Sequence, residues 1–210
     1  LESIKKIVQY ITDKTTFISI SQQLLNLDNQ VLDGNFYHDR TLTIYSGNTL
    51  ELADGRILFV NGDLIMKANS NLIGNVVVFG SVIFEGSSST QSTFLGTLYI
   101  GNHFTSNTKL IAGQSDRPSF IFSTLHNNIN QKIEGYVFIT GSKFTYDVKD
   151  VTSTIHGGVY VDDNDYKVLR GVLNIIPTDI TLFYDLFETY ALPYDSSLVS
   201  DGSYTYTSPR

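Results

Sequence analysis

Short apolar runs, each opened by a glycine and followed by a polar turn, recur from about Thr41 to Ile176. The pattern is clearest between Gly55 and Glu85, where the unit occurs twice in succession. Within each run the apolar positions alternate with a period of two, which predicts β-strands. Aligned by their opening glycines, the units begin at Gly55, Gly74, Gly96, Gly135 and Gly157, at intervals of 19, 22, 39 and 22 residues.

A repeat of about 20 residues made of strands and tight turns predicts a β-solenoid, in which each unit is one coil. A single coil cannot bury its apolar face, so we expect the coils to stack in parallel about 4.8 Å apart. The interval of 39 residues is close to two units and predicts a degenerate coil between Gly96 and Gly135. The repeat length predicts six or seven coils by the same argument. An antiparallel sandwich or meander would have similar strand spacing and remains an alternative.

The alternation also predicts which side chains line the interior of the coil. Those are Ile57, Phe59, Leu64, Met66, Val76, Val78, Val82, Phe84, Leu98, Ile100, Val137, Ile139, Val159 and Val161. Aromatic residues at alternate positions, such as Phe79, Tyr99, Tyr136 and Tyr160, would then point outward. They would form either a contact surface or a layer packed beneath helices and loops.

The first 14 residues predict an amphipathic α-helix. Ile4, Ile7, Val8 and Ile11 have the i, i+3, i+4, i+7 spacing of one apolar helix face. Residues 15–27 fit either a continuation of this helix with a β-branched middle or a separate helix after a turn. Residues 28–40, which include Asp33-Gly34 and Asp39, predict a connection.

The predicted organisation has three parts: residues 1–40 with the helix and connection, 41–176 with the solenoid, and 177–210 with a C-terminal cap and tail. Two polar stretches interrupt the repeat, a turn at 86–93 and a larger excursion at 114–130 with a short strand at 120–122. After Pro177 a helical pattern of Ile180, Phe183, Leu186, Phe187 and Tyr190 predicts a short helix that covers the last coil. The fold class is therefore mainly β, a parallel β-solenoid with an N-terminal amphipathic helix and a short C-terminal helical cap.

Composition and charge restrict the classes of partner. The net charge of -7 opposes binding of nucleic acid or of an anionic membrane surface by the bulk of the chain. Cysteine is absent, which excludes disulfides and thiolate metal sites. The sequence contains no apolar stretch long enough to span a bilayer. It begins at Leu1 within an expected helix, so we expect a leader or hydrophobic anchor upstream of it.

Few residues suggest chemistry. Asp162, Asp163 and Asp165 form the densest acidic cluster, which could hold Ca²⁺ or form an Asx-rich turn. The four histidines, His38, His103, His126 and His156, share no metal-binding spacing and predict isolated surface or loop positions. Acidic residues do not align from one unit to the next as they would in the active site of a β-helix glycosidase. We therefore predict a chain without catalytic residues, cofactor or bound metal.

The glycine-punctuated strands at Gly55, Gly74 and Gly157, placed behind an amphipathic N-terminal helix, resemble the β-solenoid minor pilins of bacterial type IV pilus systems. The resemblance covers Leu1 to about Pro177. It implies that the helix continues upstream into a hydrophobic membrane anchor, and that Ile4, Ile7, Val8 and Ile11 pack against neighbouring subunits in the filament.

The resemblance further implies a non-catalytic role at the cell surface. The partners would be other pilin subunits and a host or environmental surface ligand, with the membrane reached only through the upstream anchor. Two alternatives remain: an extracellular carbohydrate-active β-helix enzyme, and a scaffold polymer similar to bactofilins, which also have glycine-rich solenoid repeats.

Overall fold

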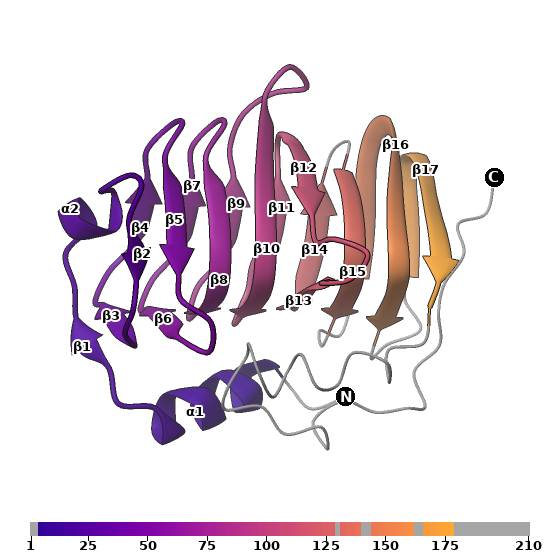
Figure 1. Ribbon diagram of the computed structural model, residues 1–210. Helices are drawn as coiled ribbons and strands as arrows, with labels where there is room; N and C mark the ends of the chain where they lie inside the picture. Colours follow the sequence, from indigo (N-terminus) through magenta and orange to yellow (C-terminus); the bar gives the residue numbers. More distant parts are fainter. Residues whose placement is uncertain (1–3, 129–130, 140–143, 162–165, 179–210) are drawn as a thin grey trace.

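The computed structural model describes residues 4–128, 131–139, 144–161 and 166–178. Most of these residues lie in short strands wound around a single axis (Figure 1). In chain order the elements are α1 (Ile4–Lys14), β1 (Ile18–Ser19), α2 (Gln22–Leu25), β2 (Val31–Leu32), β3 (Phe36–His38), β4 (Leu42–Ile44), β5 (Thr49–Leu52), β6 (Ile57–Val60), β7 (Leu64–Met66), β8 (Asn71–Val78), β9 (Val82–Phe84), β10 (Gln91–Ile100), β11 (His103–Ser106), β12 (Lys109–Ala112), β13 (Ser119–Ser123), β14 (Leu125–Asn128), β15 (Gln131–Ile139), β16 (Phe144–Val161) and β17 (Tyr166–Pro177).

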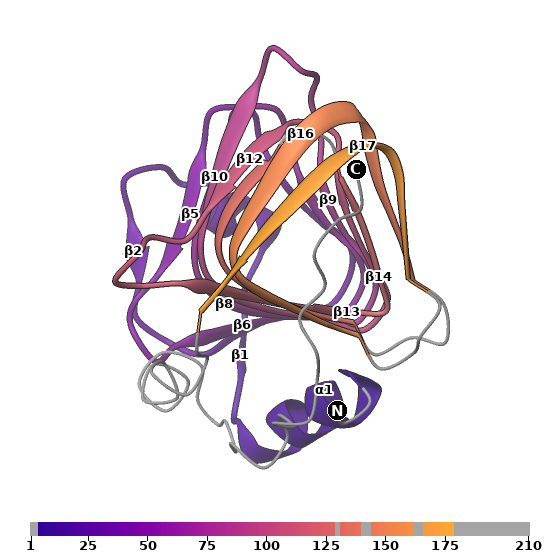
Figure 2. The same cartoon turned by 90° about the vertical axis from the view of Figure 1, so that its right-hand side faces the viewer.

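The strands form a parallel β-solenoid of about six turns, which confirms the predicted mainly β, parallel-solenoid architecture and excludes the antiparallel alternative. A view along the axis shows three faces around a central core (Figure 2). One face is the five-stranded sheet β14-β11-β9-β7-β4. The other two belong to a single twelve-stranded sheet, because long strands such as β8 pair with β5 through one half and with β6 through the other.

The register between coils differs from the alignment made by opening glycines. That alignment placed Gly74 on Gly55. In the structure Ile57 pairs with Asn75, so Gly74 lies level with Arg56 and the alignment is one residue out of register. In parallel sheets such a slip exchanges the two faces of a strand.

That slip explains the error in the predicted interior. Leu58 and Val60 belong to the core, whereas Ile57 and Phe59 lie in a second cluster outside the coil. The run Ile57–Val60 is apolar throughout because both of its faces are covered, so it contains no alternation from which its phase could be predicted. The predicted interior residues between Leu64 and Val159 all belong to the core, and the side chain of Val161 lies outside the described residues.

The degenerate coil predicted between Gly96 and Gly135 is present. Strand β13 pairs with β10 on one side and with β15 on the other, and Ser119 occupies the register position of Gly135. The predicted excursion at 114–130 is shorter than expected, since β13 and β14 return to the solenoid, and among its described residues, 114–128, the chain leaves the sheets at 114–118.

The N-terminal helix is confirmed as α1, while residues 15–27 form strand β1 and the separate helix α2. Strand pairing begins within the segment assigned to the helix and connection, because β1 pairs with β3 and β2 with β5. The predicted C-terminal helix at 178–190 lies outside the described residues except for Thr178.

Glycines are required where the long strands turn a corner. Gly96 has φ of +138° and lies directly on Gly74 of the preceding coil, so a Cβ at Gly96 would overlap the carbonyl oxygen of Gly74. Gly157 stands on Gly135 in the same way. The close approach of backbone to backbone at this corner therefore excludes side chains.

We predict that Gly96→Ala destabilises the protein by about 3 kcal/mol or more, because it combines a disfavoured φ with a backbone overlap. Gly47→Ala is the matched control, since Gly47 has φ of +78° but nothing within 4 Å of its added Cβ. It should cost only about 1–2 kcal/mol, the contribution of the backbone conformation alone. Urea unfolding of the two variants measures the difference; equal losses would contradict the predicted overlap.

Candidate functional site

Helix α1 lies lengthwise along one outer face of the solenoid, beneath β8 and β10 (Figures 1 and 2). Ile4, Ile7, Val8 and Ile11, the residues predicted to pack against neighbouring subunits, are between 0% and 3% exposed within this single chain. They join a cluster with outward-facing side chains of the sheet. The apolar face of the helix is thus covered by the chain's own sheet, and the predicted contact of these four residues with other subunits stays a prediction.

The outer face on which α1 lies also carries a column of aromatic side chains from four successive coils. Tyr99, Phe122, Phe138 and Tyr160 stack at centroid distances of 5.0, 4.4 and 5.2 Å. Tyr99, Tyr136 and Tyr160 were predicted to point out of the coil as a surface or as a packed layer, and their burial confirms the packed layer. This side of the solenoid therefore has a second hydrophobic layer outside the core.

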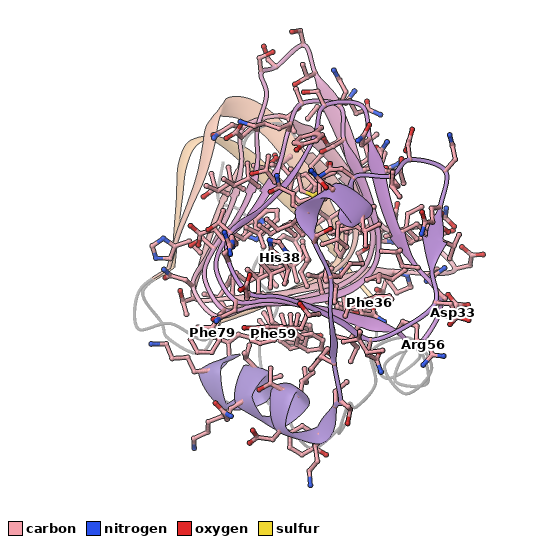
Figure 3. The ribbon with its side chains drawn as sticks, turned by 90° about the vertical axis from the view of Figure 1, so that its left-hand side faces the viewer. Asp33, Phe36, His38, Arg56, Phe59 and Phe79 are labelled. Carbon is pink, nitrogen blue, oxygen red and sulfur yellow. The ribbon has the colours of Figure 1, made fainter. Side chains whose placement is uncertain are left out.

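Phe79 is the exception, with 57% of its surface exposed. It follows the end of β8, and Figure 3 shows it beside Phe59 on the side of the solenoid that faces α1. The centroids of these two rings are 6.4 Å apart. A cleft of about 180 Å³ between the helix and the sheet is lined by Phe79, Gly101, Lys5, Val8 and Gln9.

The outer face of α1 is polar and exposed. Lys5, Lys6, Gln9, Tyr10 and Asp13 lie on it. The ammonium group of Lys14 lies 5.9 Å from the centre of the Tyr10 ring, within the range of a cation–π contact. This face and the Phe79 cleft together present lysine side chains and two exposed aromatic rings, Tyr10 and Phe79, to the surroundings.

The far end of α1 leads to the first coil, where α2 covers the open end of the solenoid (Figure 1). Ser21 is the N-cap of α2, and Leu25 of α2 is buried in the core. The side chains of Gln22 and Asn26 hydrogen-bond to the backbone of Thr43 and Tyr45, at the edge of β4. An isolated surface amide gives no sequence signal for such a contact, so these two residues could not be predicted.

A second polar group lies at a corner of the solenoid. Nδ1 of His156 lies 3.0 Å from Oε2 of Glu134, and Nζ of Lys132 lies 4.0 Å from Oε1 of the same carboxylate. Glu134 and His156 are register partners on β15 and β16. Each directly precedes an opening glycine of the repeat, Gly135 or Gly157, a signal from which the pair could have been found.

The excursion at 114–118 lies next to this pair. Gln114 and Arg117 close it through two backbone hydrogen bonds of 2.9 and 3.1 Å, and the Arg117 guanidinium lies 3.5 Å from the carboxylate of Asp54. The cavity between the excursion and the Glu134–His156 pair has a volume of about 50 Å³. On this measure a water molecule needs about 10–15 Å³, so the space has room for a few waters.

Two of the four histidines are buried, which corrects the prediction that all four lie at the surface or in loops. His38 and His126 occupy interior rows of the coil, and Figure 3 shows His38 inside the ring of strands. Nδ1 of His38 donates to the carbonyl oxygen of Ile20 at 3.0 Å. The His126 ring stacks on Phe104 at 4.6 Å, and burial lowers the pKa of His126 to about 3.

The remaining candidates give no assembled site. Asp162, Asp163 and Asp165, the candidate calcium ligands, lie outside the described residues. Within the described ranges, no three His, Asp or Glu side chains are close enough to share a metal ion. Neither α1 nor α2 has both the length and the apolar character needed to cross a bilayer.

Comparisons with known proteins add no assignment. No family model, no curated protein and no solved structure matches the chain.

We predict that Ile7→Ala lowers the free energy of unfolding by about 2–4 kcal/mol, because Ile7 is fully packed between α1 and the sheet. Tyr10→Ala, on the outer face of the same helix, should cost less than about 1 kcal/mol. Urea unfolding followed by circular dichroism measures both. Similar losses in the two variants would show that α1 is not bound to the sheet through its apolar face.

We predict that His126 makes the protein less stable in acid. Its pKa is lowered in the folded state, so the unfolded chain binds a proton first, and stability falls as the pH drops from about 6.5 towards 3. Between pH 7 and pH 4 the loss due to this residue is about 3 kcal/mol. The measurement compares the wild type with His126→Phe, which retains a ring beside Phe104; an unchanged pH dependence would refute it.

Proposed function

We propose that this chain is a non-catalytic structural or adhesive subunit of a cell-surface filament, of the type IV minor pilin kind. The observation that carries the proposal is the seating of α1, whose apolar face is buried on the solenoid while its polar face stays exposed. A helix attached in this way and continued upstream by an apolar segment would hold the solenoid rigidly on the filament. The sequence resemblance described above supports the same arrangement.

The packing of α1 changes which residues would contact other subunits. Because the chain's own sheet covers Ile4, Ile7, Val8 and Ile11, the proposal assigns contacts with neighbouring pilin subunits to the exposed side of the helix. That side carries Lys5, Lys6 and Tyr10. A cationic helix face on a chain of net charge -7 is complementary to the acidic surface of a second such subunit.

The solenoid would serve recognition in this proposal. Two of its three faces lie away from the helix (Figure 2), and the excursion at 114–118 is fastened to a distant coil through Arg117 and Asp54. A loop held in one conformation loses little entropy when it binds a partner. We therefore place the contact with a host or environmental surface ligand on this extracellular part of the subunit.

Two observations weigh against the alternatives. A scaffold polymer built by end-to-end stacking needs open strand edges, whereas Gln22 and Asn26 occupy the β4 edge. A carbohydrate-active enzyme needs two carboxylates facing a sugar-sized groove. Among the described residues, the pocket of about 450 Å³ beside β1 and β3 is lined by one carboxylate, Asp39, and the cavity of about 50 Å³ beside His156 by one, Glu134.

The proposal predicts that the protein is recovered with filaments sheared from the surface of the organism that encodes it. The double variant Lys5→Glu, Lys6→Glu should reduce this recovery about tenfold, because it reverses the charge of the exposed helix face. Lys109→Glu on β12 is the matched control, since Lys109 is also exposed but lies on the solenoid. Quantitative immunoblots of sheared and cellular fractions measure the ratio. Wild-type protein confined to the cytoplasm would refute the proposal.

A further inference from the structure

A pocket of about 450 Å³ lies between the first two coils of the solenoid. One wall consists of residues 19–22, where the chain passes from β1 into α2, and the other of residues 38–40, where it leaves β3. The volume is within the range of about 300–1,000 Å³ that small-molecule pockets have. These residues are distinct from those that line the Phe79 cleft and the cavity beside Glu134, so the pocket is a separate candidate site.

Most of the side chains that line this pocket are polar. Ser19 and Ser21 contribute hydroxyl groups, and Asp39 and Arg40 contribute opposite charges. Nε of Arg40 lies 3.3 Å from Oδ1 of Asp39, and the two side chains are 78% and 56% exposed. A pair as exposed as this contributes little to folding stability, so both groups stay available to a ligand. Because their charges cancel, the lining favours a neutral ligand that both donates and accepts hydrogen bonds.

His38 is a polar residue in a row of the interior that is otherwise aliphatic. It pairs in register with Val60 of the next coil, and Val60 pairs with Val78 of the coil after that. The histidine is only 5% exposed and also lines the pocket, which places it at the floor, with the exposed Asp39–Arg40 pair towards the mouth. A departure from the pattern that the other coils keep is typical of a functional position.

One nitrogen of the His38 ring has no partner. Nδ1 lies 3.0 Å from the carbonyl oxygen of Ile20, which can only accept, so the proton lies on Nδ1. In the neutral ring Nε2 is then an acceptor, and no group among the described residues hydrogen-bonds to it. A buried acceptor without a donor costs free energy, and a hydroxyl group that donated to Nε2 would remove this cost.

We propose that this pocket binds a neutral sugar, and that one sugar hydroxyl donates to Nε2 of His38. Hydroxyl groups both donate and accept, so the same sugar can donate to the Asp39 carboxylate and accept from the Arg40 guanidinium. With one lining carboxylate in place of the pair that glycosidases use, the pocket binds the sugar without cleaving it. The inference does not rest on the filament role: binding to the purified chain tests it, whereas recovery with sheared filaments tests the filament role, and either can fail alone.

The first experiment measures sugar binding and its dependence on the mouth of the pocket. The probes are maltose, cellobiose and lactose, titrated into ¹⁵N-labelled protein and followed by amide chemical shifts. We expect at least one of them to bind with a Kd of about 1 mM or below, and Asp39→Ala to weaken this binding at least about tenfold. The matched control is Asp33→Ala, because Asp33 forms the same kind of exposed pair with Arg56 at a corner away from His38 (Figure 3).

No binding of any of the three sugars would overturn the proposal. So would equal affinity of the wild type and Asp39→Ala, an equal loss in Asp33→Ala, or shift changes that centre on the Phe79 cleft.

A second pair of variants tests the contact with Nε2. In His38→Asn the side-chain amide can still donate near the position of Nδ1 but has no acceptor at the position of Nε2, whereas His38→Gln places its amide near Nε2. We expect His38→Gln to bind the sugar at least about tenfold more tightly than His38→Asn. Equal affinities of the two variants would overturn the assigned contact. Circular dichroism shows whether both variants fold, and if either does not, the comparison of Asp39→Ala with Asp33→Ala decides.

Discussion

Stacking of one coil on the next through parallel backbone hydrogen bonds is the interaction on which the whole molecule depends. A coil of about 20 residues has no stable core or complete set of hydrogen bonds by itself, and obtains both from its neighbours. Where the ladder breaks at a corner, side chains continue it: Asn35 Oδ1 accepts from Ile57 N at 2.9 Å, and Asn75 Oδ1 accepts from Thr97 N at 3.2 Å. The same requirement applies at the first coil, where α2 supplies both the apolar plug and the amides.

The repeat also places side chains of the same kind above one another in successive coils. This stacking creates a second apolar layer outside the core. Inside the coil this gives rows of aliphatic side chains, and on the outer side that faces α1 it gives the stacked column from Tyr99 to Tyr160. A flat column of aromatic rings would be a large exposed patch on a lone solenoid. Because α1 has a complementary apolar face, helix and solenoid form one folded body, and the polar side of the helix becomes part of its surface.

The sequence allowed prediction where a local rule applied to each unit. Corner glycines fixed the approximate period, and helical spacing identified α1, since both depend on neighbouring residues. The phase of Ile57–Val60 could not be predicted, because a strand covered on both faces has no alternation. His38 and His126 were misplaced because only the folded chain supplies the Ile20 carbonyl and the Phe104 ring that accommodate them. The Gln22 and Asn26 contacts depend on how α2 sits over β4, whereas Glu134 and His156 would have been paired by the glycine that follows each of them.

Contacts that run along the axis give this fold a mechanical property. In a solenoid without them, pulling on the two ends would separate one pair of coils at a time, because each coil touches only its neighbours. Here α1 spans successive strands of one face, and Arg117 reaches Asp54 at a position 63 residues earlier in the chain. A tensile force along the axis must therefore break these longitudinal contacts together with the ladders between the coils from Asp54 to Arg117.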